Sequence, residues 1–193
     1  MKRLLFGLLL SGFVVLPAMA ALKAGDPAPD FTAQASLAGN DFTYSLQNAL
    51  KKGPVVVYFY PSAYTGGCDL EAHTFAEQSD KFAAAGASII GVSADDLTRL
   101  KRFSADPNFC AGKFPIASDA DTKIATSYNL NVGAARDGAK DVNQDVIGHA
   151  FIERVTYVVG KDGKIMAVMS SKDDKLTPDQ HVDKSLAIVA AAK

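Results

Sequence analysis

The chain has 193 residues, 48% of them hydrophobic, so it can close one buried core and is too short for two ordinary domains. Its 20 basic and 21 acidic residues give a formal net charge of -1 at pH 7. Nucleic-acid binding needs clustered cations, and the sequence has no basic stripe, so this balance argues against a nucleic-acid partner.

The first 20 residues have the pattern of a cleaved secretory signal. A basic start precedes an apolar run from Leu4 to Leu16, and residues 18–20 read Ala-Met-Ala, an A-x-A cleavage pattern. An uncleaved membrane anchor is the alternative, but the run is shorter than the ~20 residues of a spanning helix. We therefore expect residues 1–20 to be removed and residues 21–193 to form an exported domain, periplasmic or secreted, that does not associate with the membrane.

The elements predicted for the remaining chain alternate between strands and helices. Residues 25–46 predict an N-terminal β-hairpin, residues 47–53 a short connector, and the unbroken apolar run 55–60 a buried strand. The later elements are, in chain order, a helix from Cys68 to Gly86, a strand over 87–95, a helix over 96–107, a strand over 114–119, a helix over 119–130, a loop over 131–148, a hairpin over 154–170 and a helix over 177–192 that begins with a capping box. This order predicts one α/β domain with a central mixed β-sheet flanked by helices on both faces.

Cys68 ends the segment PSAYTGGC, residues 61–68, which directly follows the strand 55–60. In an open α/β sheet, functional groups gather where a strand ends and a helix begins. A cysteine in the first turn of a helix lies near the positive end of the helix dipole and near unpaired N–H groups, which both favour the reactive thiolate. Position alone leaves a structural alternative open, a buried cysteine in a tight turn.

The same segment resembles the peroxiredoxin signature P-x-x-x-T-x-x-C, present here as Pro61, Thr65 and Cys68, with Glu71 three residues further on. Further matches, in the expected order and spacing, are GDPAPDF, GVSAD, FPIASD and RVTYVVGKDGKI. The resemblance covers roughly residues 23–190, which makes it more specific than a lone motif. The chain is similar to the bacterioferritin-comigratory, or Q-type, members of that family.

This resemblance implies a thioredoxin-like fold and a thiol-dependent peroxidase that reduces hydrogen peroxide and organic hydroperoxides. By position, the implied catalytic residues are Cys68 as the peroxidatic cysteine, Thr65 as the hydroxyl that orients the peroxide, Pro61 as the shielding residue and Arg154 as the cation that stabilises the thiolate. Gly67 and Glu71 are the implied substrate-binding residues. We expect no cofactor and no metal, since no histidine lies at a metal-ligand spacing from a cysteine.

Cys110 is the only other cysteine. The implied sulfenic acid on Cys68 can condense with a second thiol, and an exported chain rarely leaves a thiol unused, so we expect Cys110 to resolve it. The predicted helix 96–107 would carry the chain about 15 Å away, so this step would require local unfolding. The alternatives are a buried free thiol at Cys110 and a cycle that uses Cys68 and an external thiol.

The expected reductant is a thioredoxin-like protein or a low-molecular-weight thiol, and the expected assembly is a monomer or weak dimer. Two other functions use the same fold. A thiol-disulfide oxidoreductase lacks support because no C-x-x-C is present, and an exported redox sensor would use oxidation of Cys68 as a switch. The polar loop 131–148 either borders the active site, because it leads toward Arg154, or is a mobile surface loop.

Overall fold

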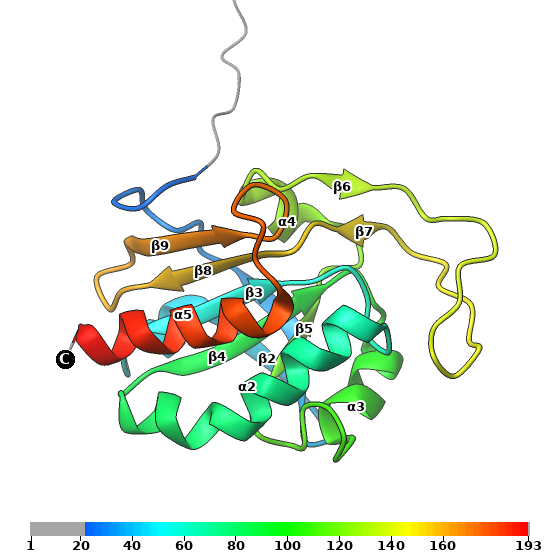
Figure 1. Cartoon of the computed structure of the whole chain (residues 1–193), viewed down its shortest axis with the longest axis horizontal. Coiled ribbons are helices and arrows are strands. Elements are labelled where there is room, and N and C mark those ends of the chain that lie inside the picture. The colour runs from blue at the N-terminus through cyan, green and yellow to red at the C-terminus, as the bar shows by residue number, and fades with distance from the viewer. Residues whose placement is uncertain (1–21, 193) are drawn as a thin grey trace, which may run out of the picture.

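The computed structural model describes residues 22–192 (Figure 1). The signal peptide expected over residues 1–20 lies outside them. The elements are, in chain order, β1 (Thr32–Leu37), β2 (Asn40–Ser45), α1 (Leu46–Leu50), β3 (Val55–Phe59), α2 (Gly66–Ala84), β4 (Ser88–Ser93), α3 (Leu97–Ala105), β5 (Ile116–Ser118), α4 (Lys123–Ser127), β6 (Val132–Gly133), β7 (Phe151–Ile152), β8 (Val155–Val159), β9 (Ile165–Ser170) and α5 (Pro178–Ala191). Within residues 22–192, no helix has both the length and the apolar character to cross a membrane.

Seven strands form the central sheet in the order β2-β1-β5-β4-β3-β8-β9. The inner strands β3, β4 and β5 are parallel, whereas the β1–β2 and β8–β9 hairpins add antiparallel strands at the two edges. The predicted mixed sheet with an N-terminal hairpin is therefore confirmed. Because β3 and β4 run in parallel side by side, the segments that follow them meet at the same edge of the sheet.

Helices cover both faces of the sheet, as the alternating order predicts. Successive side chains of β3 point to opposite faces, so Val56 and Tyr58 join one core, and Val57 and Phe59 join the other. The first core packs against α2, α3 and α5, which lie in front of the sheet in Figure 1. The second core includes Leu46 of α1. Every residue of β3 is buried, which explains why its sequence has no polar break.

The structure differs from the sequence-based elements in three places. Residues 47–53 were expected as a connector, but the short helix α1 forms over part of them. The Ser45 side chain caps its first turn, and Leu46 is buried. The helix expected over 119–130 shortens to α4, and Asp119 accepts hydrogen bonds from two of its backbone amides. The loop 131–148 contains β6, which pairs with β7 in a small second sheet. The capping box predicted at the start of α5 is present.

Candidate active site

Cys68 lies in the first turn of α2, where the chain turns from β3 into the helix. Residues 60–65, called here the catalytic turn, connect these two elements. Thr65 is the extended N-cap residue, and its carbonyl accepts hydrogen bonds from the amides of Cys68 and Asp69 at 2.8 and 2.9 Å. The predicted position of Cys68 is therefore confirmed, and its side chain is only 3% exposed.

Arg154 is the cation that reaches the sulfur. Its Nη2 donates to Cys68 Sγ at 3.1 Å. The sheet brings the two residues together, because Phe59 at the end of β3 pairs with Val155 at the start of β8. Gly67 lies directly beside this guanidinium, since a Cβ there would meet Arg154 Nη2 at 3.4 Å, about van der Waals contact. The guanidinium therefore lies against the start of α2.

Glu71 forms an ion pair with Arg154 through Oε2 and Nη1. It lies three residues after Cys68 in α2, so both side chains share one helix face. The resemblance suggested Glu71 as a substrate-binding residue, whereas the structure buries it completely behind Arg154. Burial raises the pKa of the Glu71 carboxyl above its usual range, and the Arg154 guanidinium opposes this rise. Its observed contact is with Arg154, which it orients toward the sulfur.

Opposing effects set the pKa of the Cys68 thiol. Burial raises it, while the Arg154 charge and hydrogen bonds from the Thr65 side chain and the Ser62 backbone lower it. The resulting pKa of Cys68 lies above the ordinary value for a thiol, although a position at a helix N-terminus favours a lowered pKa. The reason is the near-complete enclosure of the sulfur. Access of solvent or a polar substrate to Cys68 would weaken the largest cause of the rise.

Thr65 and Pro61 both line a pocket of about 590 Å³. The Thr65 hydroxyl donates to the Ser62 carbonyl at 2.8 Å, which fixes its direction beside the start of α2. The other pocket walls come from the loop 131–148, from β7 and from Lys172. The structure therefore brings Cys68, Thr65, Pro61, Gly67, Glu71 and Arg154 to one end of the sheet.

Comparisons with known proteins agree with this site. Residues 24–168 match the AhpC/TSA family. The chain belongs to this family and is a peroxiredoxin. Chloroplastic peroxiredoxin Q of Oryza sativa subsp. japonica is 30% identical over 168 residues, which cover 87% of this chain and 67% of that protein. As a member of the family, the chain is a thiol-dependent peroxidase, an oxidoreductase.

Solved structures confirm the thioredoxin-like fold. The crystal structure of peroxidoxin BcpB from Mycobacterium tuberculosis superposes with a TM-score of 0.71 and 28% identity, over 89% of this chain and 99% of that chain. The bacterioferritin comigratory protein of Xanthomonas campestris superposes with a TM-score of 0.62 and 28% identity, over 82% and 90% of the two chains. The resemblance to Q-type members, expected from the motifs, is thus supported by relatives of that type.

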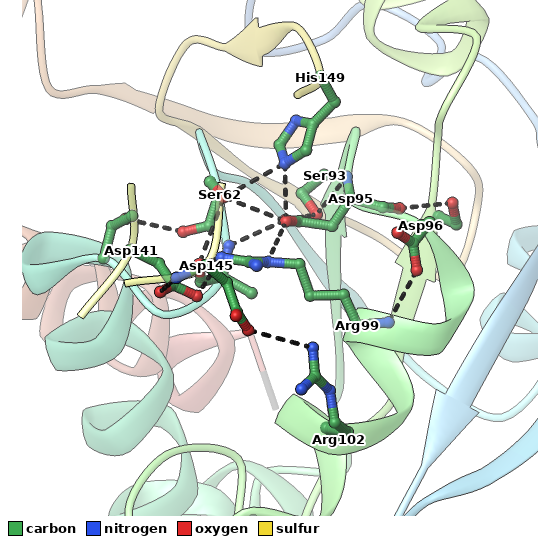
Figure 2. A network of polar contacts seen from close by, with 12 residues as sticks. Ser62, Ser93, Asp95, Asp96, Arg99, Arg102, Asp141, Asp145 and His149 are labelled. Carbon is green, nitrogen blue, oxygen red and sulfur yellow. Dashed lines mark hydrogen bonds and ion pairs between the residues drawn. The ribbon is translucent and has the colours of Figure 1, made fainter. Parts of the chain in front are cut away.

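In this peroxiredoxin, the Asp95 side chain bonds to the catalytic turn (Figure 2). Its carboxylate accepts hydrogen bonds from Ser62 Oγ at 3.1 Å and from the Ala63 amide at 2.9 Å. Arg99 contacts the same carboxylate through Nε at 2.9 Å and donates from Nη2 to the Ala63 carbonyl, also at 2.9 Å. These contacts fix the backbone that carries the Thr65 hydroxyl and precedes Cys68.

Two residues of the loop region complete this polar network. His149 Nε2 lies 2.8 Å from Asp95 Oδ1, and His149 Nδ1 lies 2.8 Å from the Ala150 carbonyl oxygen, so both ring nitrogens face acceptors. Asp141 pairs with Arg99, and the amide of Val142 donates to the Tyr64 carbonyl at 3.0 Å. The loop 131–148 therefore lies against the catalytic turn, the first of the two positions considered for it.

The pKa values of Asp95 and His149 move in opposite directions. Burial alone would raise the pKa of Asp95, but hydrogen bonds and charge from His149 hold it below its ordinary value. Burial alone would lower the pKa of His149, but Asp95 raises it. The sequence contained a signal for Asp95, since it follows β4 as the catalytic turn follows β3, and these strands are parallel neighbours. Nothing comparable marked His149 or Asp141.

Cys110 lies in the loop after α3. Like Cys68, it is a buried free thiol. This loop turns back onto α2, where His73 Nδ1 lies 3.0 Å from the Asn108 carbonyl oxygen. The rise of the predicted helix 96–107 was expected to carry the chain away from Cys68, and it did not predict that the loop turns back. Both cysteines belong to the same buried cluster. Cys110 thus shares the core beneath the active site.

Proposed function

We propose that this peroxiredoxin is an exported enzyme that reduces hydrogen peroxide and organic hydroperoxides through a sulfenic acid on Cys68, which Cys110 then resolves. The main observation that supports this proposal is the contact of 3.1 Å between Arg154 Nη2 and Cys68 Sγ in the first turn of α2. A guanidinium stays charged at any working pH, so it supports the thiolate whenever it forms.

The first chemical step is a nucleophilic substitution at oxygen. The Cys68 thiolate attacks one peroxide oxygen, an S–O bond forms, and the O–O bond breaks. The bonding pair leaves with the second oxygen, which takes a proton and departs as water or an alcohol. Arg154 donates hydrogen bonds at the place where negative charge develops, which is the usual way a protein lowers such a barrier. The Thr65 hydroxyl donates its one proton to the Ser62 carbonyl, so it would meet the peroxide through its oxygen, as an acceptor of the peroxide O–H.

Organic hydroperoxides are supported as substrates by the pocket beside Thr65. Its volume of about 590 Å³ lies within the range of pockets that bind small organic ligands. The similar Xanthomonas campestris protein was solved in a study of its alkyl peroxide reduction activity. The combination extends the proposed substrates beyond hydrogen peroxide.

In the second step, the Cys110 thiol attacks the Cys68 sulfenic sulfur, so that a disulfide forms and water leaves. Two observations support Cys110 as the partner: it shares a buried cluster with Cys68, and its loop contacts α2. Since both sulfurs are enclosed, the bond requires local unfolding of the catalytic turn or of the Cys110 loop. A thioredoxin-like protein or a low-molecular-weight thiol then reduces the disulfide. A cycle with Cys68 alone is the competing scheme.

Export is supported by the signal pattern of residues 1–20. Expression of the whole chain in a Gram-negative host should yield a mature protein that begins at Ala21 and is recovered from the periplasm. A mature N-terminus at Met1 would remove this part of the proposal. For the assembly we propose a monomer or weak dimer, which light scattering over a range of concentrations would test.

Single-turnover oxidation by hydrogen peroxide tests the catalytic proposal. Wild-type protein should consume peroxide much faster than free cysteine, and Cys68→Ser should abolish that reaction. The matched variant Cys110→Ser keeps the reacting sulfur and should still form one sulfenic acid per chain. If Cys68 reacts no faster than free cysteine, or if Cys68→Ser consumes peroxide as wild type does, the proposed chemistry is wrong.

A further inference from the structure

Asp69 is an acidic residue in the first turn of α2 that the proposed chemistry does not use. It directly follows Cys68 in the chain. His73, four residues further on, lies on the same side of the helix, and its Nδ1 lies 3.0 Å from the carbonyl oxygen of Asn108. The side of α2 that carries Asp69 therefore faces residues 106–115, called here the Cys110 loop.

The carboxyl group of Asp69 lacks a partner for one of its oxygens. Oδ1 is buried and accepts no hydrogen bond from the described part of the chain. None of the ion pairs within residues 22–192 includes Asp69. Burial removes the water that would stabilise a negative charge, so an enclosed carboxylate without a cation favours its protonated form.

Negative charge from two other segments adds to this effect. Asp106 is the C-cap residue of α3 and begins the Cys110 loop, and Asp141 belongs to the loop 131–148. Burial raises the pKa of the Asp69 carboxyl to about 6, and the Thr65 backbone opposes this rise. The charges of Asp141 and Asp106 both add to it. An ionised Asp69 is therefore less stable in the closed arrangement than it would be in water.

The charge of Asp69 also acts on Cys110. Burial raises the pKa of the Cys110 thiol well above its ordinary value, and the charges of Asp106 and Asp69 raise it further. The thiolate is the nucleophile in disulfide chemistry, so Cys110 must leave this enclosed position before it can attack. One carboxyl group thus lies beside Cys68 in the chain and opposes ionisation of Cys110 in space.

Tyr64 couples the catalytic turn to the Cys110 loop. Its φ of 57° lies in the left-handed region, which is unfavourable for a residue that carries a side chain. Ring contacts hold it there, with centroid distances of 4.9 Å to Phe103 and 5.4 Å to Phe109, the residue before Cys110. Displacement of the Cys110 loop removes the Phe109 contact and lets the turn relax. The two segments should therefore open together.

We infer that Asp69 opens the active site for the second chemical step: loss of its proton favours a locally unfolded state in which the first turn of α2 separates from the Cys110 loop. The opening exposes the Asp69 carboxylate to water and frees Cys110 to reach the Cys68 sulfenic acid. This inference rests on the proposed function and adds the residue that controls its resolving step. The step itself is unchanged: a sulfur–sulfur bond forms, the sulfur–oxygen bond breaks, and water leaves.

The pH dependence follows from the two pKa values of Asp69. The carboxyl should titrate near its ordinary value of about 3.9 in the open state and at about 6 in the closed state. A closed-state pKa that is raised means that opening is least favourable below about pH 4, increases as pH rises to about 6, and stays constant above it. At neutral pH the ionised Asp69 therefore favours the opening that resolution needs.

The reaction of Cys110 with a dithiodipyridine, which attacks thiols in acid as well as at neutral pH, measures the opening. Every protein compared carries Cys68→Ser, so that Cys110 is the only thiol. Dividing the rate of the chain with Asp69 by the rate of Asp69→Asn cancels the titration of Cys110 and of the reagent. We expect this ratio to rise about tenfold between pH 4 and pH 7, about half of what the two pKa values allow on a logarithmic scale, since the Asp69 side chain is partly exposed.

The matched control is Asp80→Asn. Asp80 is an exposed residue of the same helix, roughly 16 Å from Asp69 at 1.5 Å per residue, and a ratio taken against this variant should not change with pH. An effect of the Asp69 charge without opening has the opposite sign. Because that charge raises the pKa of Cys110, it would make the chain with Asp69 react more slowly than Asp69→Asn as pH rises.

Two results would overturn the inference: a ratio that stays flat or falls from pH 4 to pH 7, or an equal rise against Asp80→Asn. Peroxide treatment of wild type at pH 7 is measured beside them. If the Cys68–Cys110 disulfide forms while the ratio stays flat, the role of Asp69 fails and the proposed function stands. If the ratio rises and no disulfide forms, the opening by Asp69 stands and the resolving step of the proposed function fails.

Discussion

Arg99 and Asp141 form a buried ion pair that joins α3 to the loop 131–148, with Nη2 2.7 Å from Oδ2 and side-chain exposures of 7% and 0%. The same guanidinium contacts Asp95 and donates to the carbonyl of Ala63 in the catalytic turn (Figure 2). One side chain therefore anchors both the turn that carries the reaction and the loop that walls the pocket.

Removal of Asp141 should be costly. Loss of one partner of a buried pair leaves an uncompensated charge, which costs roughly 3–5 kcal/mol. Because Arg99 keeps its contact with Asp95, we expect Asp141→Ala to lower the free energy of unfolding by about 3 kcal/mol, near the bottom of that range. Urea denaturation of the variant and wild type measures it.

Asp145 provides the matched control. It pairs with Arg102 at 3.6 Å from the same loop to the same helix, but both side chains are more than half exposed. Exposed pairs contribute at most about 1 kcal/mol, so Asp145→Ala should change stability little. Equal effects of Asp141→Ala and Asp145→Ala would contradict the anchoring role of the buried pair.

Arg154 and Glu71 should shift the pKa of Cys68 in opposite directions. The Arg154 charge lowers that pKa, whereas the Glu71 charge raises it. Arg154→Gln should therefore raise the thiol pKa and slow peroxide reduction by about 100-fold, the loss typical for one donor that stabilises developing charge. The pH dependence of thiolate ultraviolet absorbance reports the pKa, and single-turnover oxidation reports the rate.

Glu71→Gln keeps the side-chain shape and removes the charge, so it should lower the pKa of Cys68. It should nevertheless slow the reaction, because Arg154 loses the ion pair that orients it. A lower thiol pKa together with an unchanged rate would show that Glu71 does not position Arg154.

The sequence predicted the location of Cys68 because that location follows from local pattern. An apolar run with no polar break marks a strand buried on both faces, and the next segment must reach the carboxyl edge of the sheet, where Cys68 lies. The resemblance to the family supplied Arg154, and the pairing of β3 with β8 explains why it reaches the sulfur.

The supporting network was not predictable in the same way. Arg99 lies on an amphipathic helix, where a charged side chain indicates a solvated face, yet it is buried. Asp141 lies in a polar loop and satisfies the amides of Asn143 and Asp145 with one oxygen while the other pairs with Arg99. Such contacts join segments far apart in the chain, so no local period or spacing records them.

His149 should make stability depend on pH near neutrality. Its pKa is raised on folding by Asp95, so its contribution is complete below the unfolded value of about 6.5 and is lost as pH rises through the folded value. Wild type should therefore lose stability above about pH 6.5, and His149→Asn should show a flatter profile in that window. Urea unfolding at a series of pH values measures both.

Asp95→Asn checks the cause of that profile, because it removes the charge that raises the His149 pKa. It should also flatten the dependence above about pH 6.5. Asp95 itself, with a lowered pKa, contributes in a separate acidic window, where stability is lost as pH falls through its folded pKa. A wild-type slope that survives in both variants would assign it to another group.

Cys110 decides how Cys68 is reset. If it resolves the sulfenic acid, peroxide-treated wild type should contain an intramolecular Cys68–Cys110 disulfide, found by mass spectrometry of unreduced peptides. Cys110→Ser should then accumulate sulfenic acid and, with excess peroxide, sulfinic acid on Cys68, because nothing inside the chain removes the first product. Since both sulfurs are buried, disulfide formation should accelerate in mild urea, which favours local unfolding. A stable sulfenic acid on Cys68 beside a free Cys110 thiol in wild type would contradict internal resolution and favour an external thiol.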